Sequence, residues 1–136
     1  MTRENKRSNI LLEVDRAVQD LRDARLLREA QSHASAVAKA YYSMFHHARA
    51  LILLEGLESR SHSGVIHLVN LHFVRADRLS PDVARFLAMY ERLRQEADYD
   101  TAAMFTVTMA DDAITAASQY GEAICEILRS SGFLSA

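Results

Sequence analysis

The sequence predicts an all-α protein, folded as a five-helix up-and-down antiparallel bundle. Only four of the 136 residues are glycine and one is proline, which is too few for the closely spaced turns of a β-sandwich or barrel. Apolar residues make up 49% and charged residues 25%, so the chain can bury a core. Apolar side chains also recur at three- and four-residue steps. The length fits one compact domain, which we assign to residues 1–136.

The first helix is expected over about residues 8–30. Leu11, Val14, Val18 and Leu21 form one apolar stripe, while the other faces of the segment are charged. Such a stripe is typical of a surface helix that packs on a core through one side. We therefore expect these four side chains to face the centre of the bundle.

The second helix is expected over residues 32–55, and it is apolar enough to be central. Ser32 is suited to cap its start, and Gly56 supplies a left-handed residue at its end. A shorter third helix is expected over residues 62–76. Its start has two candidate serine caps, at 61 and 63.

The last two helices have stronger start signals. Ser80, Pro81 and Asp82 supply a cap, a proline at the first helical position and an acid near the positive end of the dipole, so a helix is predicted over 81–98. Thr108 with Asp111 resembles a capping box that opens a fifth helix over 108–131. Short connections make neighbouring helices antiparallel.

The charge balance excludes a generally basic nucleic-acid binder, because 16 Lys and Arg stand against 18 Asp and Glu. Only two of the 16 are lysine, and arginine binds phosphate or carboxylate through a planar fork of donors.

Cys125 is the single cysteine, which excludes an internal disulfide. The longest aliphatic run, residues 50–54, is too short to span a membrane. We expect a cytoplasmic protein that does not associate with membranes.

Several common kinds of site have no signature here. His62, His67 and His72 are five residues apart, so they do not share a helix face, and no metal site is expected. Phosphate-binding glycine loops and a serine-hydrolase elbow are absent, and no cofactor is expected. His46 and His47 point about 100° apart on a helix. We expect one of them at a packed boundary and the other in solvent.

The end of the fourth helix is unusual in its charge. Arg92 with Glu96, and Arg94 with Asp98, are four residues apart and placed to pair. Acids nevertheless gather at the negative end of the helix dipole, where they are disfavoured. Broken local rules of this kind favour a functional site, and a solvated charged helix end is the alternative.

Three segments in order resemble the small HEPN-domain proteins of bacteria and archaea. They are residues 40–51 (AYYSMFHHARAL), residues 61–65 (SHSGV) following Gly56, and residues 94–99 (RQEADY). The similarity covers nearly the whole chain. The resemblance implies a five-helix domain that is usually a homodimer, often encoded beside a minimal nucleotidyltransferase and acting with it as a toxin–antitoxin or modification pair.

Many members of that family are metal-independent ribonucleases. The resemblance places an Arg and a His near the final helices with four to six residues between them, where Arg steadies the phosphate and His moves the proton of the 2′-hydroxyl. This sequence departs from that pattern, because the positions counted from Arg92 or Arg94 fall on residues 97–101 and hold no histidine.

The leading hypothesis is therefore a HEPN-type nucleotide- or RNA-associated binding subunit that acts with a nucleotidyltransferase-like partner. Arg94 would clamp a phosphate or a partner carboxylate, and Asp98 would orient it. Tyr99 would offer a stacking face, and His62 would add a titratable donor. The competing interpretation is that Arg94, Asp98 and Tyr99 form a structural network that ties two helices together.

Two further functions stay open. One is a metal-independent ribonuclease toxin in which His62 takes the place of the missing histidine. The other is a purely structural homodimer without a ligand. Growth arrest with RNA cleavage would favour the first, and a melting temperature that no nucleotide or RNA changes would favour the second.

Overall fold

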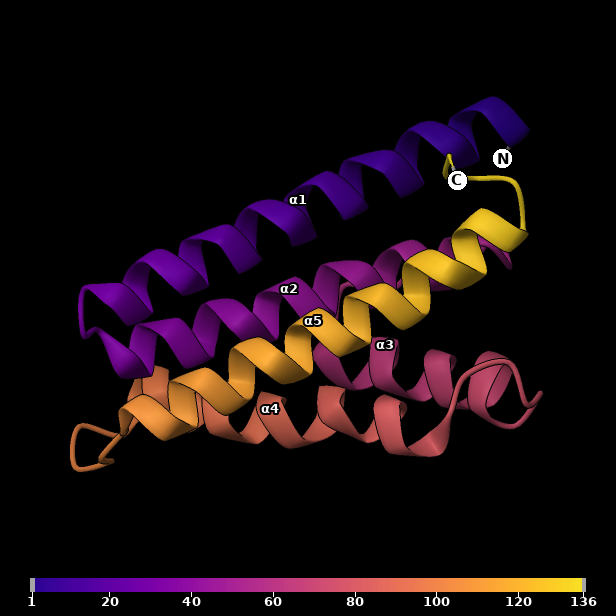
Figure 1. Ribbon diagram of the computed structural model, residues 1–136. Helices are drawn as coiled ribbons and strands as arrows, with labels where there is room; N and C mark the ends of the chain where they lie inside the picture. The colour runs from indigo at the N-terminus through magenta and orange to yellow at the C-terminus, as the bar shows by residue number, and fades with distance from the viewer. Residues whose placement is uncertain (1, 136) are drawn as a thin grey trace.

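The computed structural model describes residues 2–135 and confirms the all-α class, with no strand among these residues (Figure 1). The helices are α1 (Arg3–Glu29), α2 (His33–Leu53), α3 (His62–Val69), α4 (Pro81–Tyr99) and α5 (Val107–Ser130), and a short π-helical turn, η1 (Asn70–Val74), continues α3.

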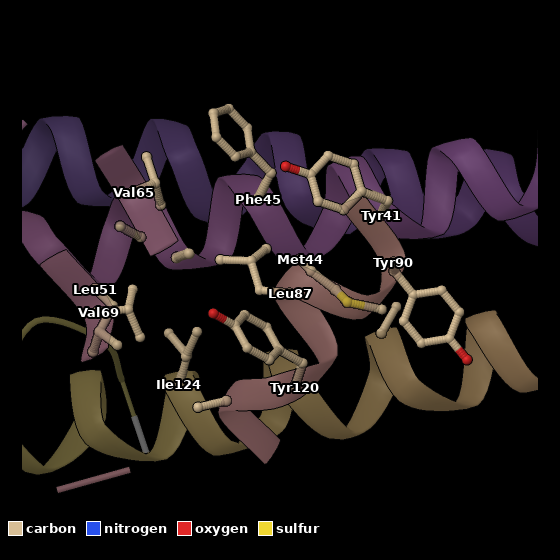
Figure 2. Packing of buried hydrophobic residues seen from close by; sticks show 14 of the residues in the cluster. Tyr41, Met44, Phe45, Leu51, Val65, Val69, Leu87, Tyr90, Tyr120 and Ile124 are labelled. Atoms are coloured by element: carbon tan, nitrogen blue, oxygen red, sulfur yellow. The ribbon is translucent and has the colours of Figure 1, made fainter. Parts of the chain in front are cut away.

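Helix α2 is the centre of the bundle. It contacts α1, α3, α4 and α5, and 14 of its 21 residues are buried. Figure 2 shows Tyr41, Met44 and Phe45 of α2 in the core, with Leu87 of α4 and Tyr120 of α5 close by. This burial explains the nearly continuous apolar sequence of α2, because a helix covered on several sides cannot be amphipathic.

The predicted start of the first helix was wrong. The helix begins at Arg3 rather than near residue 8, and the Thr2 hydroxyl caps it by accepting a hydrogen bond from the Asn5 backbone N–H at 3.1 Å. Apolar periodicity begins later in the chain, because most of the first two turns lie in solvent. The cap, and not the apolar pattern, marks this helix start.

The predicted apolar stripe of α1 was also partly wrong. Val14 is buried, but Leu11 and Val18 are 39% and 49% exposed. The buried face instead contains Ala17 and Ala24, which are fully covered. Small residues at these positions let α1 lie close to α2, so the contact face is shifted from the line of large side chains.

Two other helix boundaries, at the third and the fifth helix, differ clearly from the sequence prediction. The third helix is regular only to Val69, and the π-helical turn after it carries Phe73, which is fully buried. The fifth helix is capped by Thr106, whose hydroxyl accepts from the Met109 backbone N–H at 3.2 Å, and not by Thr108. Ser61, Ser80 and Ser32 precede α3, α4 and α2.

The two ends of the described chain lie together (Figure 1). Arg7 Nη2 donates to the Gly132 carbonyl at 2.8 Å, and the Arg3 guanidinium lies 4.5 Å from the centroid of the Phe133 ring. These contacts hold the start of α1 to the segment that follows α5.

Candidate functional site

The candidate site is a group of five side chains from three helices, which we call the Arg94 cluster. Tyr41 comes from the middle of α2 and His62 is the first residue of α3. The other three, Glu91, Arg94 and Asp98, lie on α4 at spacings of three and four residues, which places them on one helix face. The sequence hypothesis contained three members of this cluster, Arg94, Asp98 and His62, and the fold brings those three together.

A buried ion pair is the centre of the cluster. Arg94 Nη2 donates to Glu91 Oε1 at 2.7 Å, and the two side chains are 6% and 11% exposed. Gln95 Nε2 also donates to Glu91 Oε1, at 2.8 Å. Arg94 Nη1 reaches Asp98 Oδ2 at 3.4 Å, and the Asp98 side chain is 33% exposed. Glu91 is thus the tight inner partner of Arg94, and Asp98 is a longer contact at the surface.

Two tyrosine rings flank the guanidinium. The Arg94 Cζ atom lies 5.7 Å from the Tyr41 ring centroid and 5.8 Å from that of Tyr42. A cation at this distance is attracted by the negative face of an aromatic ring. Tyr41 is fully buried and Tyr42 only partly, so the Tyr42 ring adds an aromatic group at the edge of the cluster.

His62 joins the cluster through Tyr41. Its Nδ1 atom is 2.6 Å from the Tyr41 hydroxyl and 3.6 Å from Glu91 Oε2. Its ring also lies against Phe45, with 4.6 Å between the ring centroids. The side chain is 33% exposed. The hydroxyl therefore anchors one ring nitrogen of a histidine that water can reach, as expected for an oriented proton donor or acceptor.

The protonation states of the cluster follow from burial and the ion pair. Burial disfavours the charged form of Arg94, but the hydrogen bond and charge of Glu91 outweigh it and raise the arginine pKa. Burial likewise opposes the carboxylate of Glu91, yet the Arg94 and Gln95 hydrogen bonds lower its pKa. Burial, with the Glu91 charge, raises the pKa of Tyr41. At neutral pH the cluster holds a charged Arg94, a charged Glu91 and a neutral Tyr41.

The fourth residue of the sequence hypothesis lies elsewhere. Tyr99 is 77% exposed and, with Arg92 and Glu96, lines an open depression on the outer side of α4. Tyr99 is five residues from Arg94, about 140° around the helix, so the two side chains leave α4 in different directions. The expected pair of Arg92 and Glu96 is not formed among the described residues, whereas that of Arg94 and Asp98 is.

Sequence reasoning missed Glu91 and Tyr41. Glu91 carried a usable signal, because an acid three residues before Arg94 and four before Gln95 is placed to bind both on a helix. The Tyr41 ring is buried in the core, in keeping with the central helix that carries it. Its contact with His62 depends on how α2 and α3 pack, and no local pattern predicts that.

A second group of charged side chains joins α1 to α2, and we call it the Asp20 cluster. Asp20 is 1% exposed, and its carboxylate lies 3.3 Å from Arg16 Nε, 3.6 Å from Lys39 Nζ and 3.8 Å from His46 Nε2. Glu13 Oε2 lies 2.7 Å from the other ring nitrogen of His46. The prediction that one of the two adjacent histidines faces solvent was wrong, because His46 is bound to α1 and His47 is buried.

Other chemistry has less support in residues 2–135. No group of three or more His, Cys, Asp or Glu side chains in this range is arranged to hold a metal ion. Burial raises the pKa of the half-buried Cys125 thiol, which lies 3.8 Å from His47 Nε2, so the thiol is not activated. None of the helices in the same range is long and apolar enough to cross a bilayer.

Comparisons with known proteins agree with the fold. The family model described as HEPN domain matches residues 12–128. A UPF0332 protein of Gloeobacter violaceus is 43% identical over 65% of this chain and 71% of its own length. A protein of Methanocaldococcus jannaschii named "Putative toxin" is 36% identical over 70% of this chain and 71% of its own. A UPF0332 protein of Thermotoga maritima is 31% identical over 83% and 86%.

Proposed function

The chain belongs to the HEPN domain family, and from this premise we propose that it is a toxin-associated HEPN protein that binds a nucleotide or RNA at the Arg94 cluster. Two relatives from Methanocaldococcus jannaschii carry toxin in their names, which supports the toxin association. Binding is favoured over catalysis because the Arg and His spacing of the family's ribonucleases is missing after Arg94.

The observation that carries the proposal is a charged guanidinium close beneath the surface, where three helices meet. A buried arginine with a fixed inner partner is held in one orientation, which reduces the entropic cost of binding an anion. The His62 side chain is one-third exposed beside it, so a ligand that reaches Arg94 has a second polar group to contact. This combination suits a phosphate group.

Titration with ligand tests this function. We expect 5′-AMP or a short single-stranded RNA to raise the melting temperature of the wild-type chain, because a ligand that binds only the folded state stabilises it. Arg92→Ala, which changes an exposed arginine on the outer side of α4, should leave this shift unchanged. A melting temperature that does not respond to either ligand would contradict the proposal and favour the purely structural dimer.

We propose two protein partners. The first is a second copy of the chain, because α1 exposes four aliphatic side chains that a monomer leaves in water, namely Leu11, Leu12, Val18 and Leu26. Light scattering should give twice the 15.3 kDa of one chain, and the mass of a single chain would contradict it.

The second proposed partner is a minimal nucleotidyltransferase, as the family resemblance implies. Co-purification of the chain with a nucleotidyltransferase encoded beside it tests that partner.

A metal-independent ribonuclease is the second candidate function, and the geometry of His62 favours it. One ring nitrogen is anchored at 2.6 Å by the Tyr41 hydroxyl, which orients the ring for proton transfer to or from a 2′-hydroxyl. Expression of the chain alone should then arrest growth and cleave RNA in the presence of a chelator, and His62→Gln should abolish both. Intact RNA at high expression would exclude this function.

A further inference from the structure

Arg94 holds its two carboxylates unequally. The contact with Glu91 is 2.7 Å and buried, whereas the contact with Asp98 is 3.4 Å and reaches the surface. Nitrogen–oxygen hydrogen bonds are strongest near 2.9 Å, so the Asp98 contact is the weaker one. Because Asp98 is one-third exposed, the Nη1 donor that it occupies is the part of Arg94 that a ligand can reach from solvent.

Asp98 is also poorly placed on its own helix. It lies in the last turn of α4, which contains no basic residue, and the partial negative charge at a helix C-terminus disfavours an acid there. Arg94 is the group that offsets this repulsion. A carboxylate that is held by one long contact, and is otherwise repelled by its helix, costs little to turn outward into water.

The guanidinium has more donors than the two acids use. Arg94 Nε is buried and has no hydrogen-bond partner among the described residues. Arginine carries five N–H donors, and a phosphate group presents several acceptor oxygens where Asp98 presents one within reach. The partly buried Tyr42 ring, 5.8 Å from Arg94 Cζ, lies where a base attached to that phosphate can stack.

We propose that Asp98 is a built-in anionic latch: its carboxylate occupies the surface-facing donor of Arg94, and a phosphate group of a nucleotide or RNA displaces it on binding. This inference rests on the function proposed above and adds how access to the site is controlled. It assigns Asp98 the role of a competitor of the ligand, which is the opposite of the orienting role expected from the sequence.

The test compares two variants that remove the same charge from the same turn of α4. Asp98→Asn removes the carboxylate that contacts Arg94, and Glu96→Gln removes an exposed carboxylate outside the cluster. Dissociation constants are measured by calorimetry for 5′-AMP, which has a phosphomonoester, and for a short single-stranded RNA without terminal phosphates. These two arms distinguish a nucleotide phosphate from a backbone phosphate as the group that binds.

We expect Asp98→Asn to tighten binding of at least one probe by about tenfold, which is the scale of one charge-assisted contact. Glu96→Gln should change it less than about twofold, because an exposed charge is screened by salt. Equal tightening by both variants would overturn the latch in favour of a general charge effect. Weaker binding by Asp98→Asn, with the wild type binding normally, would overturn the latch but leave the proposed function intact.

Failure of the wild type and of Asp98→Asn to bind either probe would overturn both the latch and the proposed function. Asp98→Ser provides a second variant without the charge, and it is used if the asparagine variant does not fold. The melting temperature of each variant without ligand confirms that the folded chain is being compared. The Asp98 variant that folds must bind more tightly than the wild type for the latch to hold.

Discussion

The two charged clusters of this bundle bury opposite kinds of group. In the Asp20 cluster the buried side chain is an acid, 1% exposed, and the bases around it are partly exposed. In the Arg94 cluster the most buried side chain is a base, 6% exposed; it is paired with the buried Glu91, and its second acid, Asp98, reaches the surface. A buried cation with a displaceable acid can accept an external anion. A buried anion surrounded by bases of the same chain cannot.

The histidines of the two clusters differ in their ring contacts and in their exposure to solvent. Both ring nitrogens of His46 face acids of α1, at 2.7 Å from Glu13 and 3.8 Å from Asp20. His62 is held at Nδ1 by the neutral hydroxyl of Tyr41 and remains one-third exposed. The Asp20 cluster therefore ties α1 to α2, whereas the Arg94 cluster combines a structural tie with an accessible surface.

Arg94→Ala should have the largest effect on stability. It leaves Glu91 buried without its ionic partner, and breaking a buried pair in this way costs about 3–5 kcal/mol in the free energy of unfolding. Denaturant midpoints measure the loss, with the exposed Arg92→Ala as the control at under about 1 kcal/mol. Equal losses in the two variants would mean that the ion pair of Arg94 and Glu91 does not stabilise the fold as a buried pair does.

Acid should destabilise the folded chain through His47 of α2, the neighbour in sequence of His46 in the Asp20 cluster. Burial lowers the pKa of His47 from 6.5 to about 4, so the unfolded chain binds the proton first as the pH falls. The stability present above pH 6.5 should fall by roughly 3 kcal/mol by pH 4, at about 1.4 kcal/mol for each pKa unit. Unfolding titrations of His47→Gln should lack this component, and an unchanged acid loss would contradict it.

Asp20→Ala should cost less than Arg94→Ala, although Asp20 is the more buried residue. Its partners Arg16 and Lys39 are 59% and 36% exposed, so water can solvate them after the acid is removed. We expect a loss of about 1–2 kcal/mol, measured by urea unfolding. A loss as large as that of Arg94→Ala would contradict the difference between a buried acid and a buried base drawn above.

Tyr41→Phe should have the smallest effect. It removes one hydrogen bond to His62, a change of about 0.5–1.5 kcal/mol in the free energy of unfolding. The matched control is Tyr120→Phe, because the buried Tyr120 hydroxyl has no partner among residues 2–135 and its removal should cost nothing. If both substitutions have the same effect on thermal unfolding, the Tyr41 hydroxyl does not anchor His62.

The sequence predicted helices better than contacts. Apolar periodicity placed all five helices, but it put Leu11 and Val18 of α1 in the core because it counts large side chains. The close contact with α2 uses Ala17 and Ala24, whose small size carries no periodic signal of its own. Start signals were reliable at Pro81 and misplaced at Thr108, where an equivalent threonine two residues earlier forms the cap.

Prediction of the candidate site was limited in the same way. Arg94 and Asp98 are four residues apart on one helix, so local geometry is enough to join them. Tyr99 is exposed on another side of the same helix and is not part of the Arg94 cluster, because neighbours in sequence are not neighbours around a helix. Glu91 is three residues before Arg94 on the same helix, so local geometry could have joined it to the cluster as well. Tyr41 belongs to the cluster through packing between helices, which depends on the whole fold.

The most direct test of the Arg94 cluster as the binding site is an NMR titration that observes the histidine ring nitrogens. A short single-stranded RNA or 5′-AMP is added to the wild-type chain while the His62, His46 and His47 signals are followed. We expect the His62 signals to shift with ligand concentration, because this ring is exposed beside Arg94, and those of the other two to stay in place. A shift of the His46 signals with His62 unchanged, or no shift at saturating ligand, would contradict the proposed site.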